Sequence, residues 1–502
     1  MPHSGPFILA LDEGTTGTSA ALFDQEGQKI SRSYEEIPQF FPKPGWVEHD
    51  AESIWQASQR VLRAVIKKAK IKPQDVEALG ITNQRETIVA WDGTTGKPLS
   101  NAIVWQCRRT SDMCEDLKRQ GAENWVREKT GLVIDPYFSG SKVRWYLEND
   151  KAVQRARSQG RLRFGTIDSW LLYRLTGRRV HGTDPSNASR TLLMDLGRVD
   201  YDDELLDLFK ARREEMPAIL DSAGDLGMMD SSIIGREIPV TGIAGDQQAA
   251  LFGQGCVEPG MTKNTYGTGC FVLTNAGKRR PRPPDGILAT MGWRIRGRTR
   301  YALEGSVFMG GAVIQWLRDG LKIIKKSKES ESLARSTKDD GGVVLVPAFT
   351  GLGAPHWDPY ARGAVFGLTR GTNRGHLARA ALQSIALQSA EVVEVLAKGT
   401  GKPITSLRVD GGATQNDLLL QYQADLLGIP VERSQYPETT AQGAAFLAGI
   451  GVGLWKGPKA TSRRWRSGGT FEPKADDAWR RNEWRRWNEA VRRTRGWVTA
   501  TT

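Results

Sequence analysis

Cysteine is scarce in this chain of 502 residues and has no regular spacing. Only four cysteines occur, at positions 107, 114, 256 and 270, and no two form a Cys-x-x-Cys pair. Zinc cages and redox dithiols use such close pairs, so the sequence gives no support to either class. A low and irregular cysteine count instead favours a reducing compartment.

Long apolar runs are also missing. No uninterrupted apolar stretch approaches the roughly 20 residues that a membrane span needs. The first residues carry no cationic segment, and the apolar run behind them, Phe7–Leu11, is five residues long. We therefore expect no signal peptide, no stable membrane insertion and a cytoplasmic location.

Positive charge is in excess but unevenly placed. Lys and Arg total 70 against 57 Asp and Glu, a formal net charge of +13. A basic balance can indicate a nucleic-acid or membrane partner. However, the last 47 residues, Lys456–Thr502, carry +8 of that charge, and the remaining +5 is ordinary for a body of this size. We expect no nucleic-acid partner.

The basic C-terminal segment has a helical pattern. Trp484, Trp487 and Val491 stand at i, i+3 and i+7 among arginines, which predicts an amphipathic helix over 477–497. We interpret it as a terminal helix that packs its tryptophans on the second domain. The alternative is docking to an anionic surface.

Short apolar strands and helices alternate along the chain. Phe7–Leu11 and Ala20–Asp24 predict two strands joined by a glycine- and threonine-rich turn, Ala51–Lys70 predicts a helix, and Ala78–Thr82 predicts another strand. This alternation predicts an α/β fold.

A second strand, turn and strand follow in the other half of the chain. Thr265–Leu273 resembles the first hairpin in chemistry, which suggests a duplicated architecture with one loop from each half facing a shared cleft. Glycine and proline cluster at Gly253–Gly260 and predict two domains, 1–254 and 255–502. The weakly apolar stretch 275–300 predicts a surface connection.

Three glycine-rich turns could hold phosphates or a nucleotide. In Asp12–Thr18, glycine lets the backbone approach a phosphate, threonines can donate to it, and Asp12 is suited to support Mg²⁺. Tyr266–Gly269 has the same character, and Val409–Asn416 precedes a helix. Each could also be an ordinary tight turn. No phosphate-loop lysine motif and no protein-kinase catalytic loop occur, so a nucleotide site would need a different scaffold.

Polar groups also follow two predicted strands. Asp246 stands between a strand and a helix, where ligands bind in α/β sheets, although it could simply cap the helix. Arg85 and Glu86 offer a donor fork and an acceptor pair for hydroxyl groups. Trp105 and Tyr137 could supply a wall beside them.

Together these segments resemble a known family. Nine motifs occur in order: Asp12–Thr16, Pro42–Asp50, Gly80–Glu86, Trp105–Arg109, Gly131–Gly140, Gly242–Gln248, Asn264–Phe271, Pro347–Pro355 and Val409–Ala413. From about residue 7 to about residue 455 the chain closely resembles the FGGY carbohydrate kinases, and among them the members that phosphorylate glycerol.

The resemblance implies two actin-like, ribonuclease H-type α/β domains with the active site between them. The implied reaction is the Mg²⁺-dependent transfer of phosphate from ATP to glycerol, giving sn-glycerol 3-phosphate, in a homodimer or homotetramer. Asp246 would be the general base, and Asp12 would support the metal. The implied substrate-binding residues are Arg85, Glu86, Trp105, Tyr137, Asp246, Gln247 and Phe271. The implied nucleotide-binding residues are Thr15, Thr16, Thr268, Gly311, Gln315, Gly412 and Asn416.

The first loop departs from the family pattern. Glu13 stands where a glutamine is common, and Ser19 replaces an arginine that would touch the phosphates. Both changes predict weaker ATP binding or compensation by another cation. Two alternatives stay open: an FGGY kinase for a pentulose or gluconate, and a non-kinase actin-like ATPase, which would not need Arg85, Glu86 and Asp246.

Overall fold

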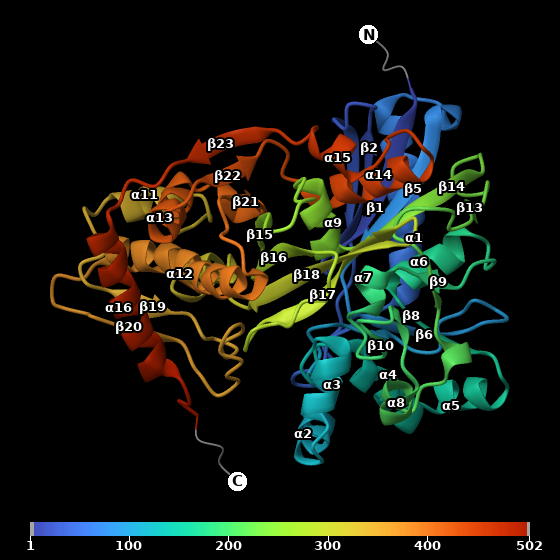
Figure 1. Ribbon diagram of the computed structural model, residues 1–502, viewed down its shortest axis with the longest axis horizontal. Coiled ribbons are helices and arrows are strands. Elements are labelled where there is room, and N and C mark those ends of the chain that lie inside the picture. Colours follow the sequence, from blue (N-terminus) through green and yellow to red (C-terminus); the bar gives the residue numbers. More distant parts are fainter. Residues whose placement is uncertain (1–4, 499–502) are drawn as a thin grey trace.

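The computed structural model describes residues 5–498, which form two α/β domains lying side by side (Figure 1). In the first domain, a six-stranded sheet has the order β13-β14-β5-β1-β2-β3. β1 and β2 form the predicted antiparallel hairpin, β3 is antiparallel to β2, and β5 and β14 continue the sheet in parallel. The strands are β1 Phe7–Glu13, β2 Gly17–Phe23, β3 Lys29–Glu36, β5 Val76–Asn83, β13 Met228–Met229 and β14 Ile238–Gly245.

The second domain repeats this order of strands. Its seven-stranded sheet runs β17-β18-β16-β15-β21-β22-β23. β15, β16 and β18 are antiparallel neighbours, and β21 and β22 extend the sheet in parallel from β15. The predicted duplicated α/β architecture is therefore confirmed. The strands are β15 Thr262–Tyr266, β16 Cys270–Gly277, β17 Leu288–Ile295, β18 Arg298–Val307, β21 Leu407–Asp410, β22 Val431–Ser434 and β23 Ser467–Phe471.

Smaller strands and helices complete both domains. A four-stranded sheet, β4-β7-β6-β8, extends the first domain, and three strand pairs lie elsewhere. These strands are β4 Glu48–His49, β6 Ile88–Asp92, β7 Ala102–Ile103, β8 Leu162–Thr166, β9 Gly182–Thr183, β10 Met194–Asp195, β11 Asp200–Tyr201, β12 Ala218–Ile219, β19 Val344–Val346 and β20 Ala364–Phe366. The helices are α1 Ala51–Ala69, α2 Ser111–Arg119, α3 Glu123–Thr130, α4 Ser139–Asn149, α5 Lys151–Ser158, α6 Ile167–Leu175, α7 Pro185–Ala188, α8 Asp203–Leu208, α9 Asp246–Gly253, α10 Ala312–Gln315, α11 Glu329–Arg335, α12 Arg374–Thr400, α13 Asp417–Leu427, α14 Thr439–Gly451, α15 Pro458–Ser462 and α16 Asp477–Thr494.

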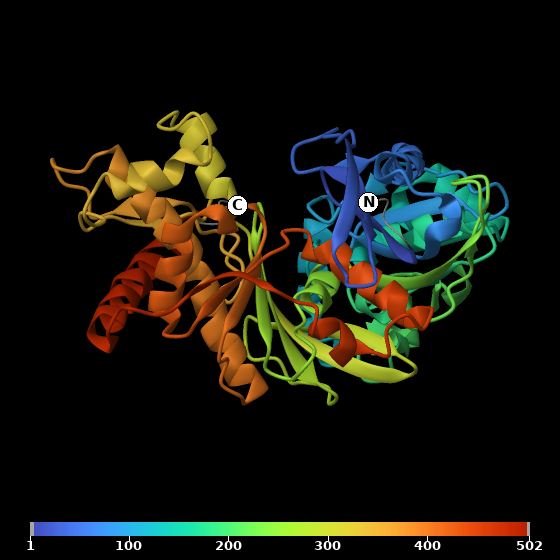
Figure 2. The same ribbon diagram turned by 90° about the horizontal axis from the view of Figure 1, so that it is seen from above.

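One helix from the second half of the chain lies on the first sheet. The orange-red α14 packs over the blue β1 and the neighbouring β5 and β14, as both views show (Figures 1 and 2). It also crosses α9 closely, because a Cβ on Gly443 would come within 1.8 Å of the Ala249 carbonyl oxygen. The division at residue 254 stays a prediction, and α14 ties the two halves together.

The longest helix, α12, is a core element. It is long and apolar enough to cross a membrane on length and composition alone. However, 72% of its most apolar window is buried inside the protein. α12 contacts α11, α13, β16 and β18, so its apolar surface is accounted for by the core of the second domain.

The basic C-terminal segment forms a packed helix, as predicted. α16 ends at Thr494, slightly before the predicted end, and it buries Trp487 and Val491 while Trp484 packs at the edge of the core. The Arg486 guanidinium pairs with Asp340 at 3.0 Å. The tryptophans therefore belong to the second domain, and some of the positive charge is paired locally.

The prediction of a surface connection over 275–300 is wrong. β17 occupies Leu288–Ile295 and lies almost fully buried against β18. Arginines and prolines before this strand, and arginines after it, lower the mean hydropathy of the window, which hid a strand whose own residues are mostly apolar.

Candidate active site

The first hairpin loop presents threonines and backbone groups at the domain interface. Its turn closes with a hydrogen bond of 3.0 Å from the Gly14 N–H to the Gly17 carbonyl. The Thr15 hydroxyl accepts a hydrogen bond of 2.9 Å from the Trp105 indole N–H, while Thr16 is exposed. This contact connects the loop directly to the aromatic wall described below.

Asp12 stands at the end of β1, beside this loop. Burial and the nearby negative charge of Asp246 raise the pKa of Asp12 to about 7, although Arg32 acts in the opposite direction. A cation placed between two neighbouring carboxylates favours the charged form of both. Mg²⁺ in nucleotide sites takes one or two carboxylates with the rest of its shell from phosphates and water, and Asp12 fits that donor set. No cluster of three metal-binding side chains exists within residues 5–498.

The prediction that Glu13 brings negative charge to the phosphates is wrong. Its side chain is fully buried and accepts a hydrogen bond of 3.0 Å from the Gln84 amide, away from the loop surface. Burial raises the pKa of Glu13 well above its usual range, so burial opposes a negative charge at this position. Ser19 is also buried, in β2 opposite Asp12.

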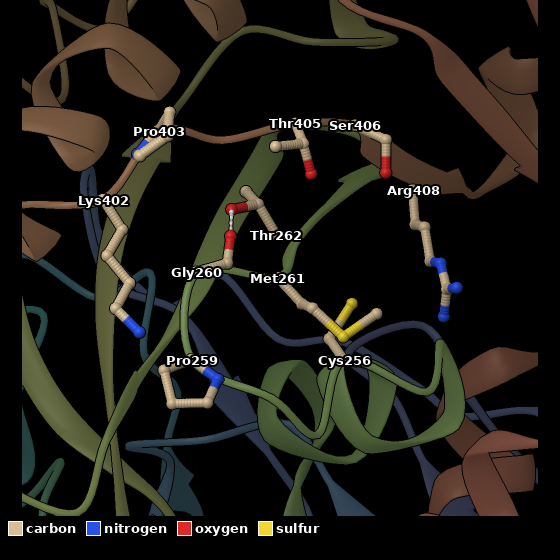
Figure 3. Close-up of a pocket in the computed structure, with 10 residues that line it drawn as sticks. All are labelled: Cys256, Pro259, Gly260, Met261, Thr262, Lys402, Pro403, Thr405, Ser406 and Arg408. Carbon is tan, nitrogen blue, oxygen red and sulfur yellow. Dashed lines mark hydrogen bonds between the residues drawn. The ribbon is translucent and has the colours of Figure 1, made fainter.

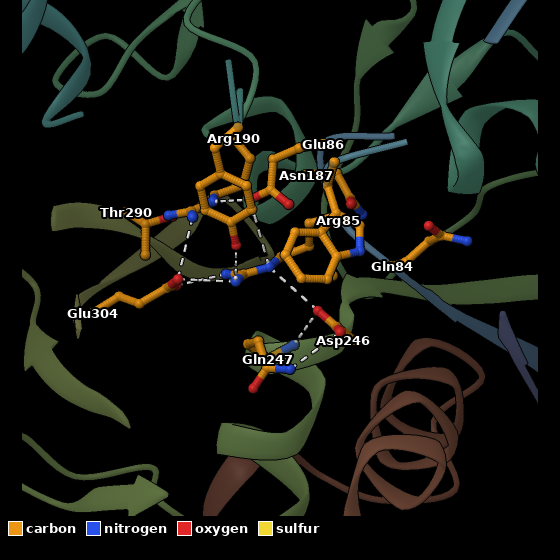
Figure 4. A network of polar contacts seen from close by, with 12 residues as sticks. Gln84, Arg85, Glu86, Asn187, Arg190, Asp246, Gln247, Thr290 and Glu304 are labelled. Carbon is orange, nitrogen blue, oxygen red and sulfur yellow. Dashed lines mark hydrogen bonds and ion pairs between the residues drawn. The ribbon is translucent and has the colours of Figure 1, made fainter. Parts of the chain in front are cut away.

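A buried network of charges lies where β5 ends (Figure 4). Both terminal nitrogens of Arg85 bind the Glu304 carboxylate, at 2.6 and 2.9 Å. Arg190 donates to Glu304 at 3.1 Å and to Glu86 at 2.6 Å. Burial would raise the pKa of Glu304, but Arg190 and Arg85 outweigh it and hold this pKa at about 2. The arginines are therefore fixed by ion pairs that come from both domains.

Asp246 faces the same network from the start of α9. Its Oδ1 lies 3.2 Å from the Arg85 Nε, and its Oδ2 accepts a hydrogen bond of 3.1 Å from the Gln247 amide (Figure 4). The residue that caps α9 is Gly245, so Asp246 does not serve as the helix cap. With 30% of its side chain exposed, against 2% for Arg85, Asp246 is the charged group that faces open space.

Three aromatic rings stand beside these charges. Trp105 is 5.6 Å from Tyr137 and 6.4 Å from Phe271, measured between ring centroids, and both pairs meet edge to face. The Tyr137 hydroxyl accepts a hydrogen bond of 3.3 Å from Arg85. Phe271 comes from β16 in the second domain, so the wall is completed across the domain interface. All seven predicted substrate-binding residues thus lie in one connected group.

Five of the predicted nucleotide-binding residues line one cavity in the second domain. This cavity has a volume of about 570 Å³ and lies between the second hairpin loop, α10, α11 and the start of α13. The Gly311 N–H donates to the Gly267 carbonyl at 2.8 Å, which holds α10 against the loop. Gly411 has a φ of +92°, a conformation that favours glycine, and it turns the chain from β21 into the cavity wall. The five residues are Thr268, Gly311, Gln315, Gly412 and Asn416.

Asn416 also has a structural task. Its side-chain oxygen accepts a hydrogen bond of 2.9 Å from the Leu419 N–H and caps α13. The amide nitrogen is the part left to contact a ligand. The predicted Thr15 and Thr16 do not line this cavity, since they belong to the opposite loop in the first domain.

Another pocket, of about 330 Å³, has none of the predicted site residues in its lining (Figure 3). Lys402, Arg408 and Thr262 are among its lining residues. The Arg408 guanidinium already has partners within the protein, because it stacks 3.9 Å from the Trp465 ring and donates to the Gln254 carbonyl.

Three buried charged residues of the site were not predicted from the sequence: Arg190, Glu304 and Lys263. Arg190 lies in a short polar segment without a recognisable motif. Glu304 carried a usable signal, because it is the one acidic residue within the apolar run of β18. Lys263 lies on β15 just before the second loop, and its ammonium donates to Gln247 at 2.6 Å.

Known protein families and relatives match most of the chain. The model of the N-terminal domain of the FGGY family of carbohydrate kinases matches residues 7–253, and the model of the C-terminal domain matches residues 262–452. The chain is 53% identical to a glycerol kinase of Dechloromonas aromatica, covering 99% of both chains, and 51% identical to glycerol kinase 2 of Thermotoga maritima, covering 98% of this chain and 99% of the relative. A crystal structure of Plasmodium falciparum glycerol kinase with ADP is similar with a TM-score of 0.90 and 35% identity, over 98% of each chain.

Proposed function

Since the chain belongs to the FGGY family of carbohydrate kinases, we propose that it transfers the terminal phosphoryl group of ATP to glycerol. The product is sn-glycerol 3-phosphate, and the reaction serves glycerol catabolism. The observation that carries the proposal is the connected group of Arg85, Glu86 and Asp246 beside an aromatic wall. Curated relatives named glycerol kinase, about half identical over nearly the full length, support it.

The substrate group suits a small triol. Gln247 offers a donor, Glu86 and Asp246 offer acceptors, and Arg85 offers a donor where a hydroxyl replaces its 3.3 Å contact with Tyr137, so each hydroxyl can be paired. Trp105 and Phe271 cover the carbon chain and exclude water, which limits wasteful hydrolysis of ATP. An analogue lacking one hydroxyl would leave a buried polar group unpaired, and sites of this kind discriminate strongly.

Asp246 serves as the general base. It is the exposed carboxylate of the group, and its two oxygens are held by Arg85 and Gln247. These contacts aim the carboxylate into the site, where it accepts the proton of the attacking hydroxyl. A base in such a position contributes about 10²–10⁴-fold to the rate.

The cavity of the second domain holds ATP, and the two hairpin loops face its phosphates. Thr15, Thr16 and Thr268 donate hydroxyl and backbone hydrogen bonds, because phosphoryl transfer depends mainly on positioning and on neutralising charge. Asp12 holds Mg²⁺, directly or through water. When bound, Mg²⁺ neutralises negative charge on the transferring phosphates.

The remaining predictions concern the assembled protein in the cell. We infer a cytoplasmic enzyme that works as a homodimer or homotetramer, with glycerol and ATP as its small-molecule substrates and no nucleic-acid partner. Analytical ultracentrifugation of the full chain measures the assembly, and a purely monomeric species at micromolar concentration contradicts this part.

ADP release with a panel of acceptors tests the function. Glycerol should give turnover in the range of about 1–100 s⁻¹ that is typical of kinases. Xylulose and gluconate should be poor acceptors, because their longer chains meet the wall of Trp105 and Phe271. Turnover that prefers either sugar would favour the other FGGY activities. ADP release that needs no acceptor would favour an actin-like ATPase.

A further inference from the structure

Lys263 is a buried cation in the interface that the reaction described above does not use. It lies on β15 with none of its surface exposed. No carboxylate among residues 5–498 forms an ion pair with its ammonium. Burial lowers the pKa of Lys263 to about 8, although Asp410 and Asp246 act in the opposite direction. Burying a lysine without a carboxylate partner is costly, so a purely structural purpose would be served better by an apolar side chain.

The contacts of Lys263 are all on groups of the substrate site or next to it. Its ammonium donates to the Gln247 Oε1 at 2.6 Å, to the Thr265 hydroxyl at 2.9 Å and to the Phe271 carbonyl at 3.2 Å. An ammonium has three donors and no acceptor, so these three bonds use all of them. Lys263 thereby joins α9, which carries Asp246, to the strand that carries Phe271.

The contact with Gln247 has a directional consequence. Because Lys263 can only donate, the oxygen of the Gln247 amide must face it, and the nitrogen must face the other way. That nitrogen donates to the Asp246 Oδ2 at 3.1 Å (Figure 4). A reversed amide would set its nitrogen against the ammonium and its oxygen against the carboxylate, and both contacts would repel.

We propose that Lys263 is a positioning residue that fixes the Gln247 amide so that its nitrogen holds Asp246 and donates into the acceptor site. This inference rests on the proposed function and deepens it. Lys263 itself does not contact the acceptor. Its effect reaches the acceptor through Gln247, so the two residues should be energetically coupled.

Steady-state kinetics of Lys263→Met, Gln247→Ala and the double variant test this coupling. Lys263→Met should lower kcat/KM for glycerol by about 10- to 100-fold, the range expected for a lost hydrogen bond from a charged group. The KM for ATP should change by less than about 3-fold, because the nucleotide cavity is separate. When Gln247→Ala is already present, adding Lys263→Met should lower kcat/KM for glycerol by less than a further factor of about 3.

Two further variants keep the test decisive. Lys263→Gln keeps an N–H donor without the charge, so it should recover much of the lost kcat/KM, and it replaces Lys263→Met in the cycle if the latter does not fold. Lys142→Met is the matched control: Lys142 is equally buried but donates only to main-chain carbonyls, so its effect should add to that of Gln247→Ala.

The outcomes separate the two proposals. If the unaltered enzyme does not turn over glycerol, the proposed function fails. If it does, but Lys263→Met keeps kcat/KM within about 3-fold or adds its full effect to Gln247→Ala, the positioning role is overturned.

Discussion

The two halves of the active site are built on different principles. On the acceptor side, Arg85, Arg190, Glu86 and Glu304 are buried and paired with one another, and the charges come from both domains. On the nucleotide side, the cavity is lined by glycines, by uncharged polar residues and by apolar side chains such as Ile314 and Leu382, with no network of paired charges among the described residues that line it. Single substitutions should therefore reduce activity or stability strongly on the acceptor side and only slightly on the nucleotide side.

Asp246→Asn should give the largest effect on activity. Asparagine keeps the size of the side chain but removes the basic oxygen, so kcat should fall by about 10²–10⁴-fold. Circular dichroism should be unchanged and the thermal midpoint should shift little, because Asp246 is not the cap of α9 and Arg85 keeps its ion pair with Glu304. Rates within 10-fold of the unaltered enzyme would remove Asp246 as the base.

Glu304→Gln should give the largest effect on stability. It leaves two buried arginines without their shared partner, which costs about 3–5 kcal/mol in the free energy of unfolding. The pKa of Glu304 is lowered to about 2, so its stabilisation is present above the unfolded value near 4.5 and is lost as the pH falls toward 2. Urea unfolding at about pH 7 and about pH 4 should show that the difference in the free energy of unfolding between the variant and the unaltered protein becomes smaller at the lower pH. A difference that does not depend on pH would contradict the ion-pair account.

Thr268→Ala probes the nucleotide side and should be mild. One hydrogen bond from a hydroxyl contributes about 0.5–1.5 kcal/mol. Its loss should raise the KM for ATP by about 2- to 10-fold and leave the KM for glycerol unchanged. Initial rates at varied ATP measure it. A loss as large as that of Asp246→Asn would erase the contrast between the two sides.

Glu13→Gln should have the smallest effect on catalysis. Burial raises the pKa of Glu13, so its contribution to stability is full below about 4.5 and declines as the pH rises. The variant should therefore match the natural chain near pH 4.5 and unfold at higher temperature than it at about pH 8, with activity within about 3-fold. Scanning calorimetry at the two pH values checks the sign, and a fall in stability at pH 8 would show that Glu13 is charged.

Local patterns predicted the parts of the fold that depend on neighbours in sequence. The hairpin of β1 and β2, the helix α1 and the packed α16 all follow from apolar spacing and turn residues within a short window. The same reasoning failed for β17. Its flanking segments are mostly polar or basic, and its burial depends on pairing with β18, which a short window of sequence does not show.

The candidate site divides in the same way. Arg85, Glu86 and Asp246 follow strand ends and could be singled out from sequence. The partners of Arg190 and Glu304 lie more than 100 residues away in the sequence. Lys263 has nearer partners, but no motif indicates that its side chain is buried against Gln247. The inward direction of Glu13 could not be predicted, because its buried partner, Gln84, lies 71 residues further along the chain.

The central claim is that the buried charge group selects a triol by pairing each hydroxyl. Comparing kcat/KM for glycerol with that for propane-1,2-diol, which lacks one hydroxyl, tests it most directly. The account predicts a preference for glycerol of about 10⁴-fold, because the missing hydroxyl leaves a buried polar group unpaired. Equal values for the two acceptors would contradict it.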